Sequence, residues 1–322
     1  MADTVPQDFD PTPLAQYGGG APTAPDWFSK AVATPFEERF VDVEGAQVRY
    51  QVWGDADKPG LLLVHGNGAH AHWWDFIAPY LTEHHQVAAM TFSGMGDSEW
   101  RDAYSLQGFA DEQMTVLADA GFFDRSAKPI ICAHSFGGFA TFLVSAKHGT
   151  RLGGTITVDT RVNPPGGKQM GPPTRPRGNR VYPTLADALA RFRLAPPQPC
   201  ENHFVMDYIA RHSLKEGTGD RGEPGWTWKF DPGIWQNFTG MDDPGALLRA
   251  TGCRTAIIRG EQSILMGNDV RDFMLDCLGG HVPFISIPHA QHHVMLDQPL
   301  AFVSAVRTLL QEWRRSAPHR NV

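Results

Sequence analysis

The chain has 322 residues, of which 42% are hydrophobic and 20% are charged, and its formal net charge is −7. A chain of this size and apolar content can bury one large core and still carry a modest insertion. The acidic balance argues against nucleic acid or an anionic membrane surface as a partner, and no apolar run is long enough to span a membrane.

Predicted strands and helices alternate along most of the chain. Residues 1–35 form an N-terminal extension, rich in proline and glycine at its start, that we expect to be loosely ordered. A hairpin opens the series of strands, which are predicted at 40–43, 47–52, 61–64, 87–92, 129–133, 155–158, 255–258 and 284–287. Helical patterns occur at 73–81, 108–120, 136–147 and 300–313. This alternation implies a mostly parallel sheet with helices on both faces.

The alternation breaks between residues 159 and 254. A stretch rich in proline and glycine is followed by amphipathic helical patterns at 185–194 and 203–215 and by an aromatic segment. We expect residues 161–251 to form an insertion between two parts of one core, 36–160 and 252–322. Candidates for the wall of a substrate pocket are the aromatic residues Trp226, Trp228, Phe230 and Trp235. The alternative for each of them is an anchor that holds the insertion on the core.

One serine stands at a predicted junction between a strand and a helix. An apolar run ends in Ala133-His134-Ser135-Phe136-Gly137-Gly138, and a helical pattern follows at once. A sharp turn here exposes the hydroxyl of Ser135, and small flanking residues prevent collisions with neighbouring backbone. The backbone N–H of Phe136 would then face a bound substrate. This pattern predicts a nucleophile; the alternative is a chance helix start.

Two further segments favour the nucleophile. Upstream, a buried strand runs into His65-Gly66-Asn67-Gly68, a turn that can bring the N–H of Asn67 beside the serine as a second oxyanion donor. Downstream, the strand 284–287 leads to His289 and to Ala290-Gln291-His292-His293 before a closing amphipathic helix. Nucleophile first and base last, each after a strand, is the chain order of an α/β-hydrolase.

With these motifs and Ser93-Gly94-Met95-Gly96-Asp97-Ser98 in order, the chain resembles the α/β-hydrolase fold superfamily from about residue 40 to residue 315. The resemblance implies an eight-stranded, mostly parallel sheet with helices on both faces and a helical cap inserted after strand six. It also implies Ser135 as the nucleophile and His292 as the base. His293 is the neighbour that does not align with the catalytic histidine of the family. Neither His70/His72 nor His84/His85 has the i, i+4 helical spacing with a nearby carboxylate that a zinc site would want, so we expect no metal and no cofactor.

The third member of the triad departs from the family pattern. Most relatives carry the acid after strand seven, but Gly260-Glu261-Gln262-Ser263-Ile264 has no aspartate at the expected position. Asp159 directly follows strand six, where some haloalkane dehalogenases and the zearalenone-type lactonases look similar in placing their acid. Because His292 needs an orienting carboxylate, we rank Asp159 ahead of Glu261.

The resemblance predicts a serine hydrolase that cleaves a small-molecule carboxylic ester or lactone through an acyl-enzyme. Serine in place of aspartate at the nucleophile disfavours haloalkane dehalogenase and the usual epoxide hydrolase chemistry. A carbon–carbon bond hydrolase and a receptor without turnover are the alternatives. The first residues lack a signal-peptide pattern and the four cysteines lack paired spacing, so we expect a cytoplasmic location. A homodimer is left open.

Overall fold

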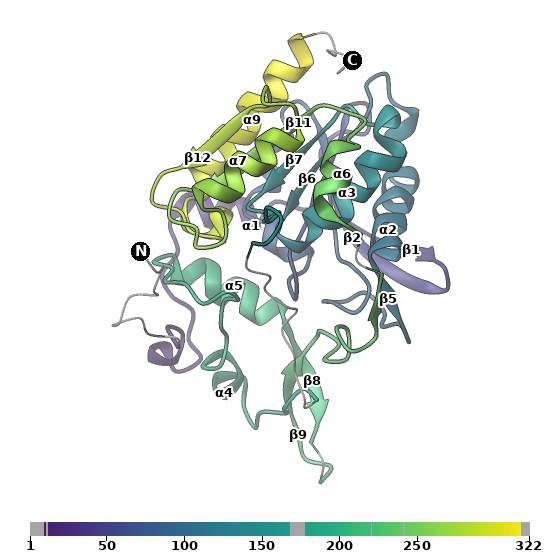
Figure 1. Cartoon of the computed structure of the whole chain (residues 1–322). Helices are drawn as coiled ribbons and strands as arrows, with labels where there is room; N and C mark the ends of the chain where they lie inside the picture. Colours follow the sequence, from purple (N-terminus) through teal and green to yellow (C-terminus); the bar gives the residue numbers. More distant parts are fainter. Residues whose placement is uncertain (1–9, 11, 168–177, 220, 241, 317–322) are drawn as a thin grey trace.

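The computed structural model of the protein describes residues 10, 12–167, 178–219, 221–240 and 242–316 (Figure 1). Its main element is an eight-stranded sheet with the order β1-β2-β4-β3-β6-β7-β11-β12. β2 pairs antiparallel with β1 and β4, and the other neighbours are parallel. The strands are β1 (Glu37–Val43), β2 (Ala46–Trp53), β3 (Gly60–Val64), β4 (Gln86–Met90), β6 (Ile130–His134), β7 (Gly154–Val158), β11 (Thr255–Gly260) and β12 (Phe284–Ile287). The predicted eight-stranded, mostly parallel sheet is confirmed.

Each central strand sends side chains to two buried layers. In β3, Leu61 and Leu63 belong to one apolar cluster, and Leu62 and Val64 belong to another, because successive side chains of a strand point to opposite faces. The first layer is covered by α1 and α9 and the second by α2 and α3, whose bounds are Asp26–Val32, Pro299–Arg315, Leu106–Asp119 and Phe136–His148. The central strands are buried along their whole length, which explains their continuous apolar sequences.

The C-terminal half adds three shorter helices to this frame. Their bounds are Pro244–Arg249 (α6), Asn268–Cys277 (α7) and Val294–Asp297 (α8). α6 and α7 share an apolar cluster with Phe142 of α3 and Ile257 of β11. In the described part of the chain, no helix combines the length and the apolarity that a membrane crossing requires.

The N-terminal extension is packed where the structure describes it, so the expectation of loose order is wrong for residues 12–35. Phe28 of α1 is 4% exposed. Its ring centroid lies 5.6 Å from that of Phe76, 4.9 Å from Phe204 and 5.7 Å from Tyr208. The high content of proline and glycine predicted loose order. A few apolar side chains, such as Phe28, bury enough surface to hold the segment on the core in spite of that composition.

The helix predicted over residues 73–81 is instead two turns of 3₁₀-helix, η2 (Ala71–Trp74) and η3 (Ala78–Leu81). Pro79 lies within η3 and cannot donate a backbone hydrogen bond, and its ring would collide with the preceding turn of an α-helix. The apolar spacing reflects the burial of residues 73–78 and 81, but these residues do not form an α-helix.

Between β7 and β11 the chain forms a mixed insertion rather than the expected helical one. Besides α6, its described elements are α4 (Leu185–Leu189), α5 (His203–His212), β8 (Leu214–Thr218), β9 (Pro224–Trp228) and β10 (Phe238–Thr239). β8 and β9 pair as an antiparallel hairpin, and Figure 1 shows α4, α5, β8 and β9 together at one end of the molecule. β10 returns to the core, where it pairs in parallel with β5 (Tyr104–Ser105).

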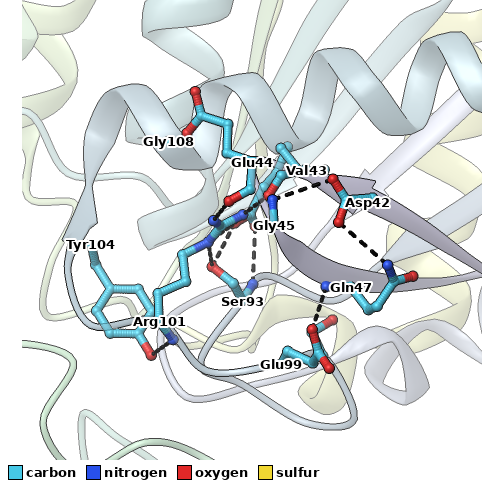
Figure 2. A network of polar contacts seen from close by, with 12 residues as sticks. Asp42, Val43, Glu44, Gly45, Gln47, Ser93, Glu99, Arg101, Tyr104 and Gly108 are labelled. Atoms are coloured by element: carbon cyan, nitrogen blue, oxygen red, sulfur yellow. Dashed lines mark hydrogen bonds and ion pairs between the residues drawn. The ribbon is translucent and has the colours of Figure 1, made fainter.

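A buried polar network holds the loop that follows β4 (Figure 2). Glu112 of α2 accepts hydrogen bonds from the N–H and hydroxyl of Ser93 and from the guanidinium of Arg101. Arg101 also donates to the carbonyl oxygens of Val43 and Glu44 at the β1–β2 turn. Burial raises the pKa of the Glu112 carboxyl, while its three donors favour the charged form. The network joins the β4 loop to the hairpin and to α2.

Candidate active site

Ser135 occupies a strained turn between β6 and α3. Its backbone has φ 50° and ψ −120°, in a region that residues other than glycine rarely adopt. The second and third residues after the serine must be small: a Cβ on Gly137 would lie 2.4 Å from the carbonyl oxygen of His65, and one on Gly138 would lie 2.1 Å from Oγ1 of Thr160. The turn that the sequence predicted is present, and it leaves Ser135 partly exposed.

His292 lies between β12 and α8, within hydrogen-bond distance of Ser135. Its Nε2 is 2.9 Å from Ser135 Oγ, and its Nδ1 is 2.8 Å from Oδ1 of Asp159. Nε2 of His134 is 3.1 Å from the backbone carbonyl oxygen of His292, a contact that holds the loop beside β6. The three side chains Ser135, His292 and Asp159 therefore form one continuous chain of hydrogen bonds.

Asp159 follows β7 and is fully buried, with φ 48°. Its Oδ2 accepts a hydrogen bond of 2.9 Å from the N–H of Gly260, and its Oδ1 accepts one of 2.6 Å from the hydroxyl of Ser263. Ser263 stands where the family usually has its acid. The sequence analysis noted Ser263 at this position but did not predict its hydrogen bond to Asp159. The absence of an aspartate after Glu261 was the signal from which this hydrogen bond could have been predicted.

The competing carboxylates lie elsewhere. Glu261 is exposed and accepts a hydrogen bond of 3.3 Å from the N–H of His289. Asp297, which the sequence analysis did not consider, accepts hydrogen bonds from the N–H of Gln291 and the amide of Gln198, and burial raises its pKa to about 6. Among the described residues, Asp159 is the carboxylate hydrogen-bonded to the His292 ring.

The two expected oxyanion donors flank the serine turn. Phe136 is the first residue of α3, so its N–H has no acceptor within the helix and lies at the positive end of the helix dipole. Asn67 belongs to the turn after β3, and that turn runs close to Ser135, since a Cβ on Gly66 would lie 3.1 Å from Ser135 Cβ. His65 braces the turn: Nδ1–H donates to Gly66 O at 2.7 Å and Nε2 accepts from Phe92 N at 3.0 Å.

The candidate pocket tryptophans differ in their surroundings. The ring of Trp228 packs against Tyr182 and Phe192, each with a centroid distance of 6.3 Å, and Trp226 pairs through its backbone with Tyr182. These partners belong to the insertion itself. Trp235 instead lies across the ring of Phe136, the residue after Ser135, at 5.1 Å and 88°. Of the tryptophans in the insertion, Trp235 therefore has a direct contact to the serine turn.

The comparisons with known proteins agree with this architecture. The model of the alpha/beta hydrolase family matches residues 61–306. The esterase Rv0045c of Mycobacterium tuberculosis is 22% identical over 276 residues, which cover 80% of this chain and 84% of that protein. Its crystal structure has a TM-score of 0.65 at 18% identity, covering 95% of this chain and 99% of that one.

Two further similarities extend the comparison. The crystal structure of E-2-(acetamidomethylene)succinate hydrolase has a TM-score of 0.69 at 16% identity, over 86% of this chain and all of that one. A haloalkane dehalogenase of Sphingobium indicum is 25% identical over 135 residues, which cover 41% of this chain and 45% of that protein. Because the family model spans well over half of the sequence, the protein belongs to the α/β hydrolase family.

Proposed function

We propose that the protein is a serine hydrolase that cleaves carboxylic esters or lactones, with Ser135 as nucleophile, His292 as base and Asp159 as the orienting acid. The observation that carries the proposal is the unbroken line of contacts from Ser135 Oγ to His292 Nε2 at 2.9 Å and from His292 Nδ1 to Asp159 at 2.8 Å. The strained backbone of Ser135 supports it, because such strain is concentrated at functional sites.

In this mechanism Ser135 Oγ attacks the acyl carbon while His292 Nε2 takes the hydroxyl proton. The N–H groups of Asn67 and Phe136 bind the oxyanion that develops on the carbonyl oxygen. His292 then returns its proton to the leaving alkoxide, which departs and leaves the acyl group on Ser135. A water molecule, deprotonated by the same histidine, releases the acid. The Asp159 carboxylate holds Nδ1–H and stabilises the imidazolium in both half-reactions.

A serine nucleophile favours acyl chemistry over dehalogenation. A haloalkane dehalogenase needs a carboxylate that forms an alkyl-ester intermediate, and the position at the turn holds Ser135. The relative that covers most of this chain bears the name of an esterase, which also favours acyl transfer. No step of this mechanism needs a metal or an organic cofactor.

We also propose that residues 161–251 act as a cap over the site and that the substrate has an apolar acyl part. Trp235 and Phe238 bring aromatic surface from the end of this segment to Phe136, with centroid distances of 5.1 Å and 6.2 Å to its ring. Aromatic walls of this kind bind apolar groups by burial of their surface. The four cysteines are free, which fits the reducing cytoplasm that we propose as its location.

A panel of p-nitrophenyl esters and γ- and δ-lactones at neutral pH tests the proposal. We expect turnover of at least one of these classes, and a decrease of kcat on the order of 10⁴-fold or more in Ser135→Ala at unchanged melting temperature. Binding of esters without release of product in the wild type would instead favour a receptor. Equal turnover by wild type and Ser135→Ala would contradict the assigned nucleophile.

A further inference from the structure

Three buried histidines meet at the candidate active site. His134, His292 and His293 each offer a ring nitrogen within 4.8 Å of those of the other two. The ring centroids of His292 lie 4.8 Å from both neighbours, and those of His134 and His293 are 5.4 Å apart. All three side chains are at most 4% exposed. The hydrolytic mechanism uses His292 alone.

The hydrogen bonds leave lone pairs on this cluster. Asp159 engages Nδ1–H of His292, so the lone pair of that ring is on Nε2. Nε2 of His134 lies against the carbonyl oxygen of His292 and donates to it, which leaves Nδ1 of His134 as an acceptor.

His293 is less satisfied, since both of its ring nitrogens are buried without a hydrogen bond of ordinary geometry. Burial and the two neighbouring histidines hold the pKa of this ring well below the usual value, while the backbone of Ala195 acts in the opposite direction. Burial also lowers the pKa of His134. The neutral ring of His293 therefore has a buried lone pair that a metal ion can accept.

We propose that His134, His292 and His293 form an inhibitory site for a divalent transition metal of the Zn²⁺ or Co²⁺ type. Imidazole nitrogens are preferred ligands of these ions. The Asp159–His292 pair adds the carboxylate that commonly supports a metal-bound histidine from its far side. The bound ion occupies the lone pair on His292 Nε2 that must receive the proton of Ser135, and hydrolysis stops. The inhibition rests on the proposed function; the metal site does not.

The distances define the kind of site. Nitrogens bound tetrahedrally to zinc at about 2.1 Å lie roughly 3.4 Å apart, which is closer than the 4.8 Å that encloses the three nitrogens here. The rings must rotate toward the ion, so binding is reversible and weaker than in a structural zinc site. Cys132 and Cys200 are poor alternative ligands, because burial raises the pKa of each thiol and disfavours the thiolate.

Metal binding is measured first without turnover. Isothermal titration of ZnCl₂ into Ser135→Ala, and the visible absorption of CoCl₂ bound to the same variant, report the site whether or not the protein hydrolyses esters. We expect one ion per chain and the intense Co²⁺ spectrum of a tetrahedral nitrogen site. Absence of Zn²⁺ binding at millimolar concentration, or a weak octahedral Co²⁺ spectrum, would overturn the proposal.

The variants His293→Phe and His281→Phe separate this site from surface histidines. A phenyl ring at 293 replaces an imidazole without hydrogen bonds, and His281 is exposed. Introduced into Ser135→Ala, His293→Phe should weaken Zn²⁺ binding on the order of 10–100-fold, and His281→Phe should leave it unchanged. His293→Leu serves if the phenyl ring prevents folding.

In the enzyme with Ser135 intact, ZnCl₂ should inhibit ester turnover by the wild type, and EDTA should reverse the inhibition. In His293→Phe, the ZnCl₂ concentration that halves the turnover of that variant without metal should be on the order of 10–100-fold higher. Zn²⁺ inhibition and affinity that are the same in wild type and His293→Phe would exclude this site. Zn²⁺ binding that depends on His293 in a protein without ester turnover would refute the proposed hydrolase and leave the metal site standing.

Discussion

Asp159 receives three hydrogen bonds, from the His292 ring, the Ser263 hydroxyl and the Gly260 N–H. Two of these donors come from the end of β11, the strand after which the family usually places the acid. β7 and β11 are neighbours in the sheet, and the N–H of Asp159 itself bonds to the carbonyl oxygen of Ile258 at 2.8 Å. The carboxylate thus follows β7 and its hydroxyl donor follows β11, and we infer that Ser263 positions Asp159.

Variants of these residues test the assignment of the acid. Asp159→Asn should lower kcat by about 10⁴-fold, because an amide favours the wrong tautomer of the histidine. Ser263→Ala removes a hydrogen bond to a charged group, worth about 1.5–3 kcal/mol, and should lower kcat by roughly 10–100-fold. Steady-state kinetics on the best ester, with melting temperatures as a folding check, measure both effects.

Glu261→Gln is the matched control, since Glu261 contacts the backbone of the same loop. It should keep at least about a tenth of wild-type kcat. The double variant Asp159→Ser with Ser263→Asp moves the acid to the strand-seven position and should exceed Asp159→Ser alone in kcat. An inactive Glu261→Gln together with an active Asp159→Asn would reverse the assignment.

At the scale of elements, β9 and β10 place the aromatic residues of the insertion differently. Trp228 of β9 lies against Tyr182 and Phe192, and Trp226 of the same strand pairs through its backbone with Tyr182, whereas Trp235 lies against Phe136. We therefore expect Trp235→Ala to change KM and acyl-chain preference. Trp228→Ala should lower the melting temperature, since it removes a partly buried aromatic side chain from its packing.

Selectivity ratios across p-nitrophenyl acetate, butyrate and octanoate, measured beside thermal melts, separate the two effects. The prediction fails if Trp228→Ala alters the chain-length preference at an unchanged melting temperature while Trp235→Ala does not. Trp226→Ala should behave like Trp228→Ala, because both lie on the same strand of the hairpin.

The elements that the sequence predicted well are those whose pattern is local. Buried parallel strands such as β6 and β7 have continuous apolar sequences, and the glycines after Ser135 marked the turn. The β8–β9 hairpin was missed because β8, with the sequence LKEGT, has one apolar residue and no alternation, so the alternating residues around Trp226 and Trp228 had no recognisable partner strand. The contact of Ser263 with Asp159 joins residues 104 apart in the sequence, so no local pattern reveals it.

At the scale of the whole molecule, buried histidines make stability depend on pH. Burial lowers the pKa of His65, His85 and His212 to about 4. In the unfolded chain these rings take up protons below about pH 6.5, whereas the folded protein resists until about pH 4. The free energy of unfolding should therefore fall with decreasing pH over this window, by up to about 1.4 kcal/mol per pH unit for each ring.

Two buried carboxyls act in the opposite direction. The pKa of Asp297 is raised to about 6 in the folded protein and that of Glu112 is raised as well, so their proton uptake at lower pH favours the folded state. Three rings outweigh two carboxyls, and thermal melts followed by circular dichroism should show a melting temperature that decreases from pH 7 to pH 5. A melting temperature that stays constant or rises over this interval would contradict the buried, neutral histidines.

The central claim is that Ser135 is a nucleophile activated by His292. Its most direct test is peptide mapping by mass spectrometry after reaction of the folded protein with a fluorophosphonate. We predict one adduct per chain, located on Ser135, with the same stoichiometry as the loss of ester turnover, because its hydroxyl lies 2.9 Å from His292 Nε2 on a strained, partly exposed turn. An adduct on Ser93, Ser263 or another serine, or complete inactivation without an adduct on Ser135, would contradict the account.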